Sequence, residues 1–211
     1  AFQKQLSTSV DVYGVTLARF IFALPFALAY LSILQWQQPV QAELHFSTMF
    51  WLYIIIAAVC QILATALMVK LFQQKNYAVG VGLAKSEAVL AAIVGVIFLQ
   101  EHLSALAWLG VAIGGIAVFL LSKGSQRSDF SFRTLAIGIG SGLSFAVTSL
   151  LVREASLELE FLPFIHRAAW VLVWVIGFQC CILLAYLGIF RRHTLYAMWQ
   201  LVGLIFKVSV C

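Results

Sequence analysis

Two charged residues lie near the middle of an apolar stretch, Ala78–Ser104, where they could bind a solute or a proton. Lys85 can hold an anionic group, and Glu87 can take up and release a proton. If the stretch is a membrane helix that starts near Tyr77, a rise of about 1.5 Å per residue places both roughly 12–15 Å into a hydrocarbon layer about 30 Å thick. A charge at that depth costs at least about 2.5–3.5 kcal/mol, so each needs a partner, a hydrated cavity or a functional role.

The helical spacing of these two charges indicates that they do not pair with each other. At 100° per residue, Lys85 and Glu87 lie about 160° apart, on opposite flanks of a stripe of small side chains. We therefore expect each to face a neighbouring helix or a solute. The alternative is a structural role, in which both are paired with buried partners such as Arg19. The stripe comprises Gly80, Ala84, Ala88, Ala91, Ala92 and Gly95.

Two arginines follow the starts of other apolar segments. Arg19 and Arg167 each lie about one turn into a predicted helix. One interpretation is that their side chains extend to the lipid headgroups. The other is that they stand at the rim of a cavity that receives an anionic substrate.

Further candidates are uncharged polar residues inside predicted spans. Ser141, Ser144 and Thr148 recur at i, i+3 and i+7 and so share one helix face. They either form hydrogen bonds between helices or line a cavity. Gln61 and Gln179 are isolated amides in the middle of their segments, and the same two interpretations apply to them.

The composition assigns the chain to the integral membrane proteins. Of its 211 residues, 63% are hydrophobic and 10% are charged, whereas soluble domains have about 45–50% apolar and about 25% charged residues. Barrel strands would be about half as long as these apolar segments and would alternate, so an all-α protein is predicted. The net charge of +5 comes mainly from residues in short loops, which indicates membrane topology and no nucleic-acid partner.

The apolar segments predict about seven membrane helices, with the lipid bilayer as their surroundings. The second and third are joined by a very short loop and should be antiparallel neighbours. The fifth is followed by a polar connector, REASLELEF. The predicted ranges are 14–34, 47–72, 78–104, 105–122, 134–152, 162–190 and a short seventh from about 195. Because the chain opens in a loop without Met and stops inside the seventh segment, we expect a fragment or a truncated gene product.

Two segments of the chain match when they are aligned with one gap: KQLSTSVDVYGVTLAR, which ends at Arg19, and REASLELEFLPFIHR, which ends at Arg167. In both, a basic residue, a serine and an acid precede an arginine near the start of an apolar span. The match predicts an internal repeat of five helices. An odd number of spans reverses direction, so the two halves would have inverted topology, and a complete protein would have ten helices.

The segments AKSEAVLAAIVGVIFLQEHLSALAWLGVAIGGIAVFLL and DVYGVTLARFIFALPFAL resemble the EamA domain of the drug/metabolite transporter superfamily. The first is similar to that domain's fourth and fifth helices, with Glu101 matching the Glu of a Gly-Glu turn and Gln100 in place of the Gly. The second is similar to the start of its second helix. The resemblance implies a ten-helix fold of two inverted repeats. Residues 1–122 would be the first repeat without its first helix, 123–133 a connector, and 134–211 the start of the second repeat.

The resemblance also implies a function: a secondary transporter in the cell (inner or plasma) membrane that moves small metabolites such as amino acids by alternating access, with Lys85 and Glu87 as substrate or proton contacts. The alternative is a non-transporting membrane remnant or structural subunit. No nucleotide-binding, hydrolase or metalloprotease motif is present, so neither an enzyme nor a cofactor is predicted, and the scattered histidines predict no metal site. Loop charges place 123–133 in the cytoplasm, whereas the resemblance places this loop outside.

Overall fold

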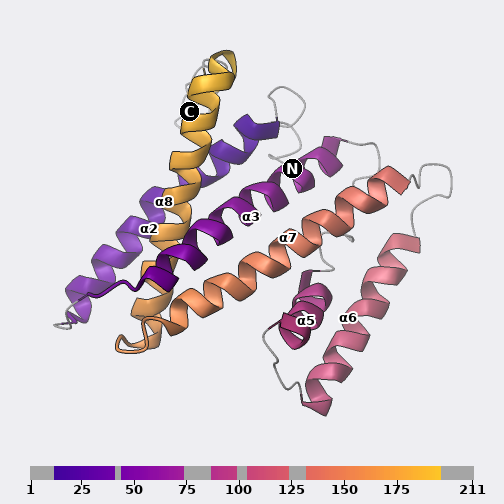
Figure 1. Ribbon diagram of the computed structural model, residues 1–211, viewed down its shortest axis with the longest axis horizontal. Coiled ribbons are helices and arrows are strands. Elements are labelled where there is room, and N and C mark those ends of the chain that lie inside the picture. The colour runs from indigo at the N-terminus through magenta and orange to yellow at the C-terminus, as the bar shows by residue number, and fades with distance from the viewer. Residues whose placement is uncertain (1–11, 41–43, 74–86, 99–103, 124–131, 196–211) are drawn as a thin grey trace, which may run out of the picture.

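The computed structural model describes residues 12–40, 44–73, 87–98, 104–123 and 132–195. Helices dominate these ranges, and no strand occurs in them (Figure 1). Four of the helices are long and apolar enough to cross a membrane, and α5 and α6 are shorter apolar helices. The helices are α2 (Val12–Gln37), α3 (Thr48–Gln73), α5 (Glu87–Phe98), α6 (Ala105–Lys123), α7 (Phe132–Leu157) and α8 (Phe164–Phe190). The predicted all-α membrane class is confirmed, while the seventh predicted segment lies outside the described residues.

Helices α3 and α7 make the most extensive contact between any two described helices and lie side by side in Figure 1. Ala57 and Ala64 of α3 are fully buried, and the hydroxyls of α7 reach their carbonyl oxygens. The Ser141 hydroxyl donates to the Ala64 oxygen at 2.9 Å, and Thr148 approaches the Ala57 oxygen at 3.5 Å. Small side chains allow two helix backbones to approach closely enough for such bonds.

Helices α2 and α8 pack in opposite directions. The start of α2, around Leu17 and Phe20, shares a buried cluster with the later part of α8, around Leu183. The end of α2, at Leu31 and Leu34, packs instead on the early part of α8. A hydrogen bond of 3.0 Å between the His166 ring Nε2 and the Gln38 carbonyl oxygen links the end of α2 to the start of α8.

The turn between α7 and α8 is held against the start of α3. Ser47 caps α3, because its hydroxyl accepts from the Phe50 backbone N–H at 3.0 Å. The same hydroxyl donates to the Glu158 carboxylate at 2.6 Å. Above this cap, Trp51 and Trp174 meet edge to face with ring centroids 4.8 Å apart, within a cluster of aromatic rings from α3 and α8.

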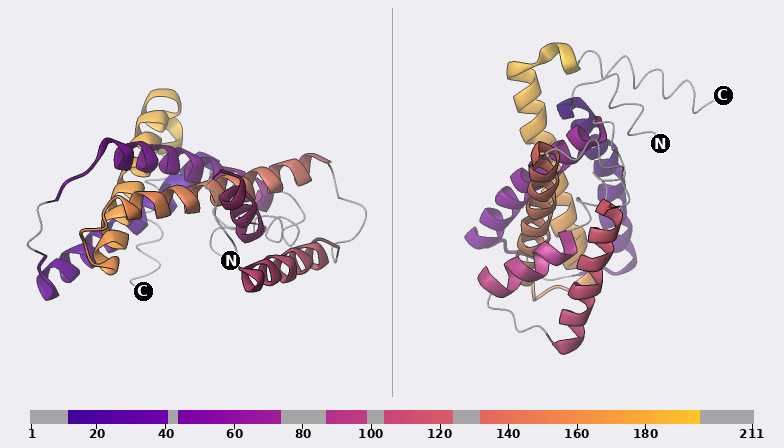
Figure 2. Two further views of the ribbon diagram at one scale, coloured as in Figure 1. Left: turned by 60° about the horizontal axis from the view of Figure 1, so that its bottom comes forward. Right: turned by 90° about the vertical axis from the view of Figure 1, so that its right-hand side faces the viewer.

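The short helices α5 and α6 lie on one side of the structure, away from α2 (Figures 1 and 2). The described residues of α5 contact α7 and α6, and α3 is not among their main neighbours, so the expected α3–α5 pairing is wrong for this part of the chain. Gly114 of α6 lies against α5, where a Cβ would be 3.6 Å from Val89. Most of the α6 side chains are exposed.

Two predicted boundaries need correction. Helix α7 does not end at residue 152 but continues to Leu157, so Arg153 is helical rather than part of a connector. Arg, Glu, Ala and Leu are good helix formers, and a change from apolar to polar residues does not by itself end a helix. Helix α2 begins at Val12, which places Arg19 about 10 Å along the helix, nearer two turns than one.

The α3–α7 contact predicts a difference between two substitutions of the same kind. Ala64→Leu introduces bulk at a fully buried position between the helices and should lower the free energy of unfolding by about 1–3 kcal/mol. Ala29→Leu adds the same atoms on an exposed face of α2 and should change it by less than about 0.5 kcal/mol. Unfolding of the purified protein in mixed micelles measures both, and equal effects would contradict the packing described here.

Candidate functional site

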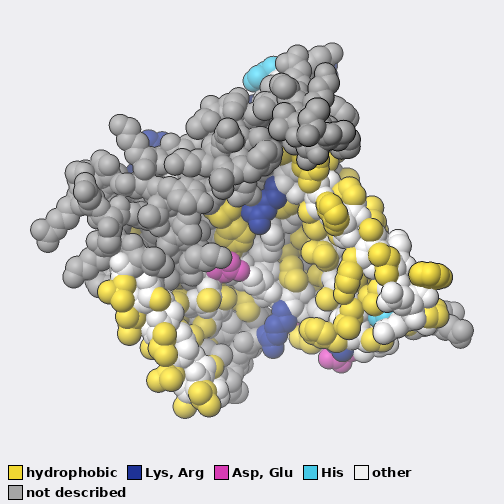
Figure 3. Space-filling view, turned by 180° about the vertical axis from the view of Figure 1, so that it is seen from behind, with side chains coloured by type: hydrophobic (Ala, Val, Ile, Leu, Met, Phe, Trp, Pro, Cys, Tyr) yellow, Lys and Arg dark blue, Asp and Glu magenta, His cyan; other side chains and the backbone are white. Residues whose placement is uncertain are grey.

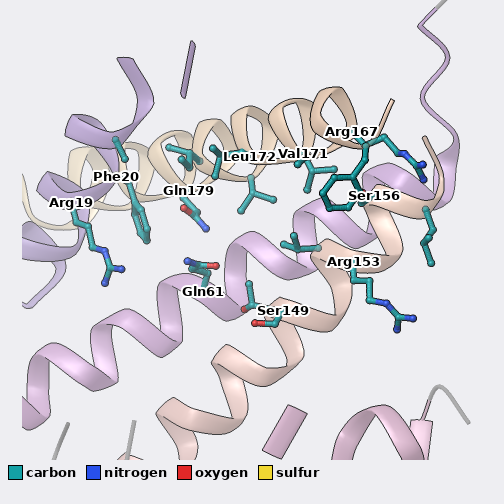
Figure 4. A pocket seen from close by; sticks show the side chains of 18 residues that line it. Arg19, Phe20, Gln61, Ser149, Arg153, Ser156, Arg167, Val171, Leu172 and Gln179 are labelled. Atoms are coloured by element: carbon teal, nitrogen blue, oxygen red, sulfur yellow. The ribbon is translucent and has the colours of Figure 1, made fainter. Parts of the chain in front are cut away.

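A cavity of about 730 Å³ lies among α2, α3, α7 and α8 (Figure 4). Its wall is largely apolar, with side chains such as Phe20, Val171 and Leu172, and each of the four helices also contributes at least one polar side chain. In Figure 3, basic side chains and an acidic patch lie along a hollow between two apolar surfaces. Concave sites of this size, mostly apolar with a few convergent polar groups, are typical of sites for small molecules.

Three polar groups from three helices lie toward one end of the cavity. In Figure 4 the Arg19 guanidinium and the amides of Gln61 and Gln179 are on the same side of the cavity, away from Arg153 and Arg167. Gln179 is fully buried, and neither its Nε2 nor its Oε1 has a hydrogen-bond partner in the part of the chain that the structure describes. A buried polar group without a partner costs about 1–3 kcal/mol. This end of the cavity is therefore suited to a ligand that carries hydrogen-bonding groups.

Two further arginines lie at the opposite end of the cavity, near the start of α8 (Figure 4). Arg153 of α7 is 3.9 Å from the Glu154 carboxylate. Arg167 of α8 is half-buried, and its Nε lacks a hydrogen-bond partner among the described residues. Along α8, Arg167 and Gln179 are about 18 Å apart at 1.5 Å per residue. Arg19 and Arg167, which the sequence comparison paired, thus stand at opposite ends of one cavity.

Glu87 is linked to the wall of this cavity by a hydrogen bond. Its carboxylate accepts a hydrogen bond of 2.8 Å from the Ser149 hydroxyl of α7, and Ser149 lines the cavity. Glu87 therefore has its partner on a neighbouring helix, as its position on the helical wheel predicted. Lys85 lies outside the described residues.

The three hydroxyl residues predicted to share a face of α7 have different surroundings. Thr148 lines the cavity. Ser141 is fully buried and bonds across to α3, and Ser144 donates to the Gly140 oxygen of its own helix at 2.8 Å. All three hydroxyls are thus bonded to backbone oxygens, since Thr148 donates to the Ser144 oxygen at 2.8 Å, and of the three only Thr148 lines the cavity.

The sequence reasoning missed three polar residues of the cavity wall: Ser149, Arg153 and Ser156 of α7. Their spacing of i, i+4 and i+7 puts them on one helix face. The pattern was present in the sequence, but the predicted helix ended before Arg153. Had the helix been extended to Leu157, the same spacing would have identified this face.

The hydrogen bond between Glu87 and Ser149 predicts energetic coupling between α5 and α7. In a double-mutant cycle of Glu87→Gln and Ser149→Ala, the coupling energy should be about 0.5–3 kcal/mol, because the first substitution removes the charge that strengthens the bond and the second removes its donor. A second cycle, with Ser144→Ala in place of Ser149→Ala, provides the control, since the Ser144 hydroxyl bonds within α7. Unfolding in micelles gives both values; coupling no larger in the first cycle than in the control would contradict the contact.

Comparison with known proteins relates the chain to one family. No curated protein and no solved structure matches it. The EamA-like transporter family matches residues 1–123, which is more than half of the chain and includes Arg19, Gln61 and Glu87. This match confirms the resemblance seen in the sequence, and the chain belongs to the EamA-like transporter family.

Proposed function

We propose that this chain forms the substrate cavity of a secondary transporter, which carries small metabolites such as amino acids across the cell membrane by alternating access. The observation that supports the proposal is a cavity between four helices long enough to span a membrane, with polar groups from each helix in its wall. In a transporter, such a cavity opens to one side of the membrane at a time while the helices move around it.

The antiparallel packing of α2 and α8 supports the proposed inverted repeat. Elements related by an axis in the membrane plane run in opposite directions, and equivalent residues then lie at opposite ends of the shared site. Arg19 of α2 and Arg167 of α8 have this relation in the cavity. We propose that they belong to two five-helix repeats of a ten-helix fold. The exchange of conformation between such repeats would open the cavity alternately at its two ends.

Glu87 is the proposed site of proton coupling. Its carboxylate accepts a hydrogen bond from Ser149, which lines the cavity. A change in the charge of Glu87 would therefore alter the electric field that acts on a bound solute. Lys85, on the same apolar segment, is proposed as a second contact for a substrate or proton. The side chains of Arg19 and Thr148 line the cavity. The hydroxyls of Ser141 and Ser144 form hydrogen bonds that stabilise α7, one of the helices around it.

A second candidate function, a structural membrane subunit without transport, is favoured by one observation. The Ser141 and Thr148 hydroxyls approach backbone oxygens of α3, so some of the polar residues in the spans hold helices together. In a structural subunit, all polar groups in the spans would serve this purpose. The buried Gln179, with both polar atoms unpartnered among the described residues, does not fit that role.

The transport assignment predicts a separation of two activities in Glu87→Gln. In proteoliposomes that contain the intact protein encoded by its gene, this variant should lose uptake driven by a proton gradient by more than about tenfold, because the group that carries the proton is gone. Exchange of labelled for unlabelled substrate, which needs no net proton movement, should continue at a similar rate. Cys181→Ala, at an exposed position of α8 outside the cavity wall, is the control and should retain both activities.

Two results would refute the assignment. The first is an intact protein that moves no solute in a screen of labelled metabolites. The second is that Lys85→Ala and Glu87→Gln lower only the stability of the helix bundle, which would favour the structural subunit.

A further inference from the structure

The cavity wall carries an excess of positive charge. Arg19, Arg153 and Arg167 supply three guanidinium groups, and none of the described residues that line the cavity is Asp or Glu. Two carboxylates lie close by: Glu154 is 3.9 Å from Arg153, and Glu87 accepts a hydrogen bond from Ser149. Three positive and two negative groups leave a net charge of +1, and the positive groups are the ones that face the cavity.

Arg19 is an exposed cation of the cavity wall, within a helix long enough to span a membrane. None of the residues that the structure describes forms an ion pair with it. A guanidinium stays charged, and in a membrane interior it needs an anion or water as a partner. Because its side chain lines the cavity, an anionic group on a bound ligand can be that partner.

Gln179 adds a second requirement. A glutamine amide offers two N–H donors and one acceptor oxygen, and in Gln179 both the Nε2 and the Oε1 are buried without a partner among the described residues. A carboxylate on the ligand can accept from the Nε2 but has nothing to donate to the Oε1. The ligand that satisfies both atoms therefore carries a hydrogen-bond donor as well as an anionic group.

From these observations, and on the basis of the proposed transport function, we infer that the cavity selects small organic anions that carry a hydroxyl or another uncharged hydrogen-bond donor. The Arg19 guanidinium and the Gln179 Nε2 would bind the anionic group, while the Gln179 Oε1 would accept from the hydroxyl. Gln61, at the same end of the cavity in Figure 4, would add a further amide contact. The volume of about 730 Å³ suits a metabolite-sized ligand.

A net-neutral amino acid fits this site less well than such an anion. Its ammonium group needs a nearby carboxylate, and the Glu87 carboxylate is outside the cavity wall and already accepts from the Ser149 hydroxyl. The guanidinium groups that attract the carboxylate of a zwitterion also repel its ammonium group. The inference therefore narrows the substrate class from small metabolites to hydroxylated anions.

Four four-carbon probes test this selectivity on the intact purified protein: L-malate, succinate, L-asparagine and putrescine. Malate is an anion with a hydroxyl, succinate lacks the hydroxyl, asparagine is a zwitterion, and putrescine is a cation. Binding is measured from the rise in thermal unfolding temperature as each probe is titrated at fixed pH and ionic strength. Malate should bind about tenfold more tightly than succinate, because one more hydrogen bond forms, and asparagine and putrescine should produce no rise.

Variants assign the selectivity to residues. Gln179→Leu should reduce the malate-to-succinate affinity ratio to about one, and it should not lower the unfolding temperature of the empty protein, because it removes an unpaired amide. Arg19→Gln should lower the affinity for both malate and succinate by at least about tenfold. Gln61→Leu provides a second amide variant, expected to weaken malate binding. Cys181→Ala, an exposed position next to Cys180 on α8 and outside the cavity wall, is the control and should leave every affinity unchanged.

The outcomes separate this inference from the proposed function. Tight binding of asparagine or putrescine, an unchanged malate-to-succinate ratio in Gln179→Leu, or no binding of either anion would overturn the inference. If zwitterions are exchanged across proteoliposomes but anions do not bind, transport stands and the anion selectivity fails. If malate binds as expected but neither malate nor any other probe is exchanged, the anion site stands and the transport function fails.

Discussion

A membrane interior offers no water for hydrogen bonds, so each polar group in a spanning helix must find a partner in the protein or lie in a cavity. Most hydroxyls of the helices that the structure describes take the first course. Thr16 donates to the Val12 oxygen and Ser32 to the Leu28 oxygen, each one turn earlier in its own helix. Ser141 instead bonds across to α3. The long side chains of Arg19 and Gln179 follow neither pattern, and both lie in the wall of the same cavity. Other buried polar atoms without a described partner, such as the Thr65 hydroxyl and the Trp174 indole N–H, lie outside that wall, so the cavity is distinguished by the guanidinium and amide groups that it brings together.

The cavity results from unequal helix contacts. Helices α3 and α7 pack closely along small residues, whereas α7 and α8 make far fewer contacts although only a short turn joins them. Near that turn, Ser47 links the start of α3 to Glu158, and the aromatic cluster around Trp51 and Trp174 packs α8 against α3. Beyond this anchored end the helices leave room between them, and Ser149 and Arg153 face that room from α7. The same arrangement keeps the cavity wall rigid on the α3–α7 side, so relative motion is more easily accommodated between α7 and α8.

The sequence was sufficient to predict the membrane class, the approximate spans and the polar residues that require an explanation, because apolar length and helical spacing are local properties. It was not sufficient to assign partners. The spacing of Ser141, Ser144 and Thr148 defined a face of α7, but only the position of α3 shows that Ser141 bonds to Ala64 while Thr148 also meets the cavity. The bond between Glu87 and Ser149 joins residues far apart in the chain and depends on how α5 packs on α7. The place of Arg153 in the cavity wall was not predicted for a local reason. The sequence changes from apolar to polar after residue 152, but α7 continues to Leu157.

The two ends of the cavity are related in sequence but differ in their surroundings, and this difference suggests different roles. Arg19 lies about 10 Å along α2, at the same end of the cavity as two amides, one of which is fully buried. Arg167 lies about 5 Å along α8, close to the turn, with the more exposed Arg153 at the same end. Exposed cations at the mouth of an apolar cleft attract anions and raise their local concentration, but they are screened by salt and hold a ligand weakly. The Arg19 side chain is also exposed, but the Gln61 and Gln179 amides at its end of the cavity add hydrogen-bonding groups that can hold a ligand in one orientation. If the two repeats exchange conformation during transport, Arg19 and Arg167 would exchange roles: the one that attracts the anion from solution would become the one that holds it. One cavity would then serve both sides of the membrane.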